Sequence, residues 1–136
     1  MSLSLIKQAL VQSYVDGSFG LSTAYENRTF EPTKGTPWAS VMVERVDGSA
    51  VTLGDSGEDN HAGYMQIDLN YPTNEGDGAI LTKLEALRAY YTPGTSFTSS
   101  GQSVIIRYCE PSGGRLVDGW YRISLTVYYY ARIART

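Results

Sequence analysis

The sequence predicts a single α+β domain, residues 1–136, in which two helices pack on one face of an antiparallel or mixed sheet of four to six strands. Residues 3–15 and about 78–91 carry apolar side chains at steps of three and four, the spacing of one helical face. Residues 64–71 and 120–133 instead alternate apolar and polar side chains, as half-buried strands do. Short turn sequences separate the strand-like segments, which favours antiparallel neighbours.

The first helix is expected over residues 3–15, followed by a long irregular connection. Its apolar stripe is Leu3, Ile6, Leu10 and Tyr14, and Asp16-Gly17 marks its end. Residues 17–37 contain Pro32, Gly35 and Pro37 and carry Phe30, so no regular strand is expected there. A connection of this length is uncommon in a compact domain unless it has contacts to make elsewhere.

Strand patterns follow from residue 38 onwards. Residues 38–46 alternate, and Asp47-Gly48 is a hairpin signal that predicts a turn into a short strand at 50–53. Residues 54–60 are expected to form an acidic, glycine-containing loop. The next strand, 64–71, ends at Pro72 and places Met65, Ile67, Leu69 and Tyr71 on its apolar face.

The second helix is expected at about 78–91, with Asp77 as its N-cap and Pro93-Gly94 beyond its end. Two shorter strands are expected at 95–99 and 103–109, with Val104, Ile106 and Tyr108 on one face of the latter, and a loop at 111–119. The helix stripe is Ile80, Leu81, Leu84, Leu87 and Tyr91. The apolar face of the last strand is Tyr121, Ile123, Leu125, Val127, Tyr129, Ala131 and Ile133.

With both helices on one face, the reverse face of the sheet is expected to stay open. Aromatic residues and Arg are enriched in interface cores, so this face is a candidate assembly interface. The alternative is that Tyr and Thr occupy the face through strand propensity alone. The candidate interface residues on it are Tyr64, Arg122, Tyr128, Tyr130 and Arg132, and Asp55, Glu58 and Asp59 are candidate charge partners for the arginines.

Composition argues against several classes of protein. The net charge of -3 and pI of about 5.0 do not suit a nucleic-acid binder that works through a basic surface. Cys109 is the only cysteine, so no internal disulfide is possible and a reducing compartment is indicated. No run of residues reaches the about 20 apolar residues of a spanning helix, and the start of the chain lacks a signal-peptide pattern. We expect synthesis in the cytoplasm and no contact with a membrane.

Candidate catalytic groups are few. His61 and Cys109 are the only possible Cys–His pair, and we expect that they do not meet. The acids of 55–59 lie in one loop, and their spacing does not match a calcium-binding loop. The glycine-containing segments 76–78 and 112–115 fit turns better than phosphate-binding loops. We therefore expect no enzyme, no cofactor and no metal; a small-ligand binding module is the minor alternative.

Three segments resemble the tail-terminator-like family of long-tailed bacteriophages, related in fold to the lambda tail terminator. They are Phe30 to Ala39 (FEPTKGTPWA), Gly63 to Leu69 (GYMQIDL) and Gly78 to Leu81 (GAIL), and the similarity extends from about Tyr25 to Ile133. The resemblance implies a sheet with helices on one face and a self-assembled hexameric ring at the head–tail junction of the virion. Such a ring caps the tail tube protein, ends its polymerisation and receives a head-completion protein, while DNA passes through the lumen without specific binding. A tail tube subunit or a neck adaptor is the alternative.

Overall fold

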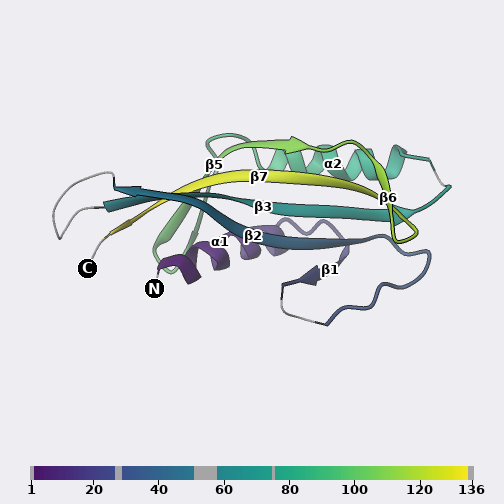
Figure 1. Ribbon diagram of the computed structural model, residues 1–136, viewed down its shortest axis with the longest axis horizontal. Helices are drawn as coiled ribbons and strands as arrows, with labels where there is room; N and C mark the ends of the chain where they lie inside the picture. The colour runs from purple at the N-terminus through teal and green to yellow at the C-terminus, as the bar shows by residue number, and fades with distance from the viewer. Residues whose placement is uncertain (1, 27–28, 51–57, 75, 135–136) are drawn as a thin grey trace.

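The structure is a computed structural model that describes residues 2–26, 29–50, 58–74 and 76–134. Within these residues, two helices and seven strands follow one another (Figure 1). In order, they are α1 (Ser2–Asp16), β1 (Ser22–Tyr25), β2 (Trp38–Ala50), β3 (Glu58–Pro72), α2 (Gly78–Tyr90), β4 (Ser96–Ser99), β5 (Gln102–Pro111), β6 (Arg115–Val117) and β7 (Trp120–Ala134).

All seven strands belong to one sheet, in the order β1-β2-β3-β7-β5-β4, with β6 paired to β7. The β1–β2 pair is parallel and the other pairs are antiparallel. The α+β class and the mixed sheet are confirmed. The sheet has more strands than the four to six expected, because β1 and β6 form within segments whose glycine and proline content predicted loops.

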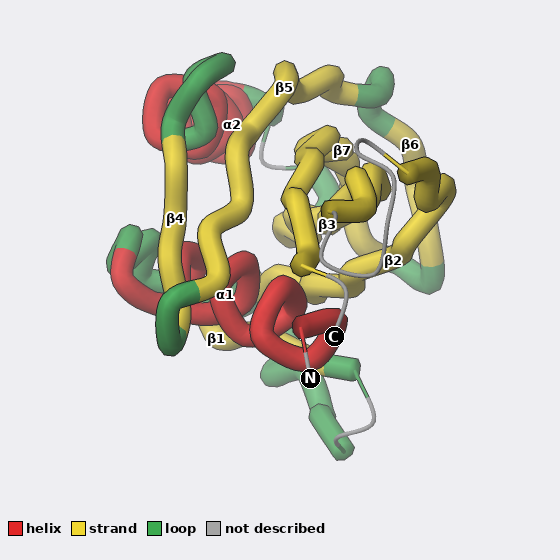
Figure 2. The backbone as a smooth tube through the Cα atoms, turned by 90° about the vertical axis from the view of Figure 1, so that its left-hand side faces the viewer, coloured by secondary structure: helices red, strands yellow, loops and turns green. Residues whose placement is uncertain are grey.

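The sheet is strongly curled, and both helices pack on its concave side. Viewed along the strands, β2, β3 and β7 lie on one side of the molecule, and α1, α2 and β4 lie on the other (Figure 2). The buried apolar residues form one cluster between these parts. Its members are Ile6, Ala9, Leu10, Tyr14, Ala39, Val41, Met65, Ile67, Leu69, Ile80, Leu84, Leu87, Tyr91, Val104, Ile106, Ile123, Leu125, Val127, Tyr129 and Ala131.

The helical stripes are confirmed where the structure describes them, with one exception. Leu81 is 40% exposed, whereas Ile80 is 1% exposed. Successive residues of a helix point about 100° apart, so two adjacent residues cannot both face the core fully. The expectation that Leu81 is buried together with Ile80 is therefore wrong. Asp77 occupies the N-cap position, but its side chain makes no capping hydrogen bond; instead its carbonyl accepts one from the Leu81 N–H, at 3.0 Å.

Hydrogen bonds and rings connect the C-terminal ends of the two helices. The hydroxyls of Ser13 and Tyr91 lie 2.8 Å apart, and the Tyr90 hydroxyl donates to the Ser13 carbonyl, also at 2.8 Å. The Lys83 ammonium donates to the Phe19 carbonyl in the connection that follows α1. This pairing holds the two helices as one layer on one face of the sheet.

The hairpin turn expected at Asp47-Gly48 is wrong. Both residues lie inside β2, opposite Ala62 and His61, after a register shift between Arg45 and Asp47. Such a β-bulge lets a strand continue past residues that would otherwise turn it. The strand expected at 50–53 is replaced by the end of β2 at Ala50, and residues 51–53 lie outside the described part of the chain.

The acidic loop expected at 54–60 is also corrected. β3 begins at Glu58, and the backbones of Glu58 and Asp59 pair with Ala134 and Ile133 of β7. Asp55 lies outside the described residues. The structure describes no burial for the side chains of Glu58 and Asp59, so what they contact stays a prediction.

Candidate assembly interface

Three tyrosines form an aromatic row on the face of the sheet that turns away from the helices. Tyr64 of β3 and Tyr128 of β7 are register partners, and their ring centroids lie 6.3 Å apart. Tyr108 of β5 stacks on Tyr128, with centroids 4.6 Å apart and 22° between the planes. Tyr64, Tyr108 and Tyr128, called the tyrosine cluster below, therefore cross three neighbouring strands.

The expectation that Tyr108 lies on the same face of its strand as Val104 and Ile106 is wrong. A register shift between Ile106 and Tyr108 reverses the alternation of β5 at this point. Ile106 is 1% exposed, whereas Tyr108 is 47% exposed. A bulge reorients the side chains that follow it, and here it brings a third aromatic ring onto the reverse face.

The remaining sequence-predicted interface residues on β7 are distributed along the strand. Tyr130 is partly exposed and lies two positions beyond Tyr128, on the same face, and Arg132 is exposed near the end of the strand. Arg122 lies near the opposite end of β7, where its Nε donates to Asn70 Oδ1 at 2.6 Å. The structure thus brings Tyr64 and Tyr128 together and keeps Arg122 away from them.

One end of the reverse face is not open, contrary to expectation. Asn70 and Ser124 are on this face, yet they are 0% and 5% exposed. Aromatic rings from distant parts of the chain meet there. The ring centroids of Phe30 and Trp38 lie 5.3 Å apart, and those of Trp38 and Trp120 lie 6.0 Å apart. The connection before β2 therefore contributes to the cover of a surface that the alternation pattern predicted as exposed.

Polar side chains at this covered end form hydrogen bonds with one another. The carboxylate of Asp68 accepts hydrogen bonds from the side chains of Ser40, Gln66 and Ser124. The Arg115 guanidinium, from β6, donates to the Ser124 hydroxyl at 2.9 Å. Buried polar groups with partners stabilise a unique arrangement and offer little to a second molecule. The exposed tyrosine cluster is therefore the better candidate for contact with other proteins.

The hydroxyl of Tyr128 remains protonated at neutral pH. Burial raises the pKa of Tyr128, and the neighbouring Tyr108 and Glu110 raise it further. A neutral phenol can donate and accept hydrogen bonds while its ring packs against apolar atoms. The cluster thus has the chemistry of a protein–protein contact.

His61 and Cys109 lie apart. Their register partners on β7 are Ala131 and Val127, and β3 and β5 flank β7 on opposite sides, so about 13 Å along the strands and two strand spacings separate them. The Cys109 thiol donates to the Tyr91 carbonyl at 3.6 Å, and burial raises its pKa although Arg88 lowers it. Within the described residues, no group of three or more His, Cys, Asp or Glu side chains could hold a metal ion.

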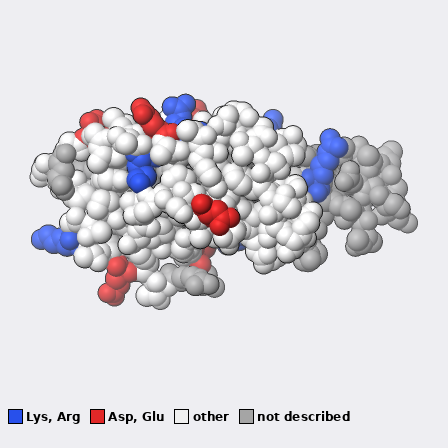
Figure 3. Space-filling view, turned by 180° about the vertical axis from the view of Figure 1, so that it is seen from behind, with Lys and Arg blue, Asp and Glu red and all other residues white. Residues whose placement is uncertain are grey.

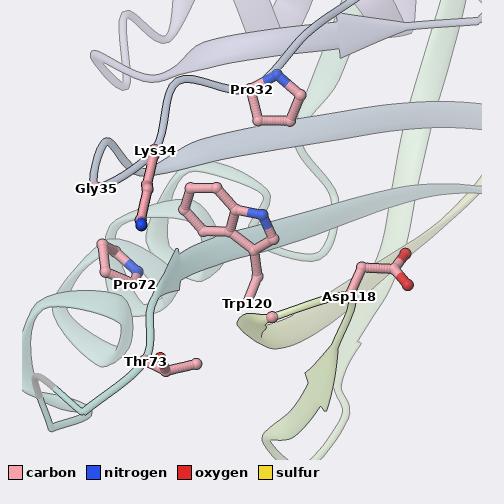
Figure 4. Close-up of a pocket in the computed structure, with 8 residues that line it drawn as sticks. Pro32, Lys34, Gly35, Pro72, Thr73, Asp118 and Trp120 are labelled. Carbon is pink, nitrogen blue, oxygen red and sulfur yellow. The ribbon is translucent and has the colours of Figure 1, made fainter.

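A hollow of about 570 Å³ lies where β2 begins and β3 ends (Figure 4). Figure 4 shows the Lys34 side chain directed towards Pro72 and Trp120, while the Asp118 carboxylate points away from them. Ligand sites usually combine an apolar wall with a few converging polar groups. The two charged groups diverge here. The lining residues are Pro32, Lys34, Gly35, Pro72, Thr73, Asp118, Gly119 and Trp120.

Comparison with known proteins gives one family match. The family model described as "Phage tail terminator protein" matches residues 5–129. No curated protein matches the chain in sequence. A solved structure with 19% sequence identity superposes with a TM-score of 0.72 and is covered over 96% of its length by 96% of this chain, which shows that the two share a fold. Neither α1 nor α2, the helices of the described chain, is long and apolar enough to cross a membrane.

Proposed function

The chain belongs to the phage tail terminator protein family and is a structural protein of the phage tail, and we propose that it forms a ring that caps the tail tube. The ring ends polymerisation of the tube and presents a surface to a head-completion protein at the head–tail junction. The resemblance of its segments 30–39, 63–69 and 78–81 to this family supports a hexameric ring.

The observation that carries the proposal is the exposed tyrosine cluster. No described helix covers Tyr64, Tyr108 and Tyr128, and Tyr108 presents 47% of its surface to solvent. Covering such a surface with another tail subunit contributes about 25 cal/mol per Å² of apolar area, before the costs of association. Because the rings already pack against each other, few side-chain rotamers are lost when a partner covers them.

The charge of the chain is consistent with this role. A terminator ring surrounds the path of the DNA, and carboxylates repel phosphate groups. A net charge of -3 therefore suits a lumen that lets DNA pass without holding it. Interface charge pairs would join Arg132 of one copy to the acids of 55–59 in the next, since Arg122 already donates to Asn70 within the subunit.

The test is a double substitution, Tyr128→Ala with Arg132→Ala, on the exposed part of the face. We expect the variant to keep the circular dichroism spectrum of the wild type and to lose ring formation in sedimentation velocity. Leu116→Ala is the matched control, because Leu116 is 72% exposed but lies on β6. An unfolded double variant would contradict the placement of these residues, and a double variant that forms rings as the wild type does would contradict their role. Open-ended filaments of the wild type would favour a tube subunit instead.

A further inference from the structure

The outer edge of β2 is only partly covered. β1 pairs with β2 from Trp38 to Val41, and β2 then continues to Ala50. Among the described residues, no strand pairs with the outer side of β2 beyond Val41. An uncovered strand edge presents N–H and C=O groups that can pair with a strand of another chain.

One side chain occupies the beginning of this edge. The Glu26 carboxylate, directly after β1, accepts a hydrogen bond from the Val43 N–H at 2.8 Å. The same oxygen, Oε1, lies 3.0 Å from the Lys7 ammonium of α1. The carboxylate therefore takes the place that the next carbonyl of a paired strand would fill, and Lys7 holds it there.

A groove lies beside the same edge. It has a volume of about 330 Å³ and lies between α1 and the first two strands. Val15, in its lining, is 48% exposed although it is apolar. Strand addition obtains affinity from backbone hydrogen bonds and specificity from pockets that receive alternate side chains. The groove is lined by Lys7, Val11, Val15, Tyr25, Glu26 and Val41.

The opposite end of the sheet order is a second uncovered edge. Among the described strands, β4 pairs with β5 alone, through the turn Ser100-Gly101, whose φ angles of 48° and 85° are those of a two-residue hairpin. In such a hairpin the backbones of Ser99 and Gln102 hydrogen-bond to each other. Along an antiparallel pair, residues that bond to the partner strand alternate with residues that do not. Phe97 therefore also bonds to β5, whereas Thr98 directs its N–H and C=O away from β5.

β4 lacks the protection that sheet edges of monomeric proteins usually have. Its sequence, Ser-Phe-Thr-Ser, contains neither a charge nor a proline. Seen from behind, much of the surface is uncharged, and the charged side chains lie mainly around its rim (Figure 3). This edge is therefore suited to pair with a strand of a second copy.

We propose that β4 of one copy pairs with the outer edge of β2 in the next copy and displaces Glu26 from Val43. This inference rests on the proposed ring and specifies its lateral contact. Two unlike edges on one subunit make a head-to-tail contact, which closes into a ring when the rotation between copies allows it. Glu26 covers the edge in the free subunit and yields to the neighbouring strand during assembly.

The first test compares two substitutions at Thr98. Thr98→Pro removes the outward N–H and the hydroxyl that bonds to Ser103, while the backbone bonds to β5 stay in place. Thr98→Val loses the same hydroxyl but keeps the N–H. We expect the protein concentration at which half of the subunits are assembled to be at least about tenfold higher for Thr98→Pro than for the wild type, equivalent to about 1.4 kcal/mol. For Thr98→Val we expect this concentration to be close to that of the wild type. Glu26→Ala should lower that concentration, and Glu26→Gln, which keeps an acceptor for Val43, should change it less.

Hydrogen–deuterium exchange of the wild type tests the pairing of β4 with β2 even if Thr98→Pro fails to fold. Within 42–50 and 96–99, the amides that point away from β3 and β5, Thr98 among them, should exchange at least about tenfold more slowly in the ring than in the monomer. Those of 104–106, already paired, should not change. A ring in which both segments exchange as in the monomer would overturn the edge pairing and leave the proposed function intact. A wild type that forms no ring would overturn both.

Discussion

Tyr108 stacks on Tyr128 at a centroid distance of 4.6 Å, across the pair β5–β7 and on the face away from both helices. Tyr128 is in turn the register partner of Tyr64. The rings support one another before any partner arrives, and such preorganisation reduces the entropy lost on binding. The bulge before Tyr108 is thus a local backbone feature with a consequence for assembly.

Removing the outermost ring of this stack should weaken assembly and leave folding nearly unchanged. Tyr108→Ala is expected to lower the unfolding free energy by less than about 1 kcal/mol, because the side chain is 47% exposed. Ring formation, followed by sedimentation velocity, should shift to higher concentration. Tyr108→Phe keeps the stack and is the control; equal assembly of the alanine and phenylalanine variants would argue against a role for the ring.

A substitution in the core should have the opposite effect. Leu125 is 0% exposed within the core cluster, so Leu125→Ala is expected to cost about 2–5 kcal/mol of unfolding free energy through the cavity it leaves. Leu84→Ala should act in the same direction. Urea denaturation measures both losses, and a urea midpoint equal to that of the wild type would refute the core position.

The hydrogen bond between the helices should contribute a smaller amount. Tyr91→Phe removes the hydroxyl that lies 2.8 Å from that of Ser13, while Ser13 still donates to the Leu10 carbonyl. The expected loss is about 1 kcal/mol. Tyr64→Phe is the matched control, since no hydrogen bond of its hydroxyl is found among the described residues. Equal effects of the two substitutions in urea denaturation would contradict this account.

The contacts of Glu26 should make stability depend on pH. Burial tends to raise the pKa of Glu26, but the Val43 N–H and the Lys7 ammonium outweigh it and lower the pKa below 4.5. Because the folded pKa is the lower one, the stabilisation is present above about pH 4.5 and is lost as the pH falls through the folded pKa. The difference in urea midpoint between wild type and Glu26→Gln should therefore shrink on acidification. A difference that stays constant with pH would count against the ion pair.

The spacing of apolar residues predicted the two helices and the long strands, because in a regular element the position of a residue in the sequence decides the face on which its side chain lies. The alternation of β7, with Tyr129 and Ala131 buried and Tyr128 and Tyr130 partly exposed, is an example. The same spacing failed between Ile106 and Tyr108, where one additional residue in β5 reverses the faces. The turn signal at Asp47-Gly48 failed beside a second bulge, between Arg45 and Asp47. A bulge depends on the partner strand, and no local pattern in this sequence indicates it.

The cover over Asn70 could not be predicted for a different reason. Arg122 bonds to Asn70 from the neighbouring strand, and the rings of Phe30, Trp38 and Trp120, far apart in sequence, meet at the same end of the sheet. The sequence placed Tyr64 and Tyr128 on one face but gave no means of deciding which part of that face stays exposed. Strand pairing decides it.

Native mass spectrometry of the wild-type protein over a wide concentration range tests the central claim most directly. We expect monomer to convert into a closed oligomer of one fixed size, which stops growing as the concentration rises further. A protein that stays monomeric at every concentration, or one that grows without limit into filaments, would contradict it.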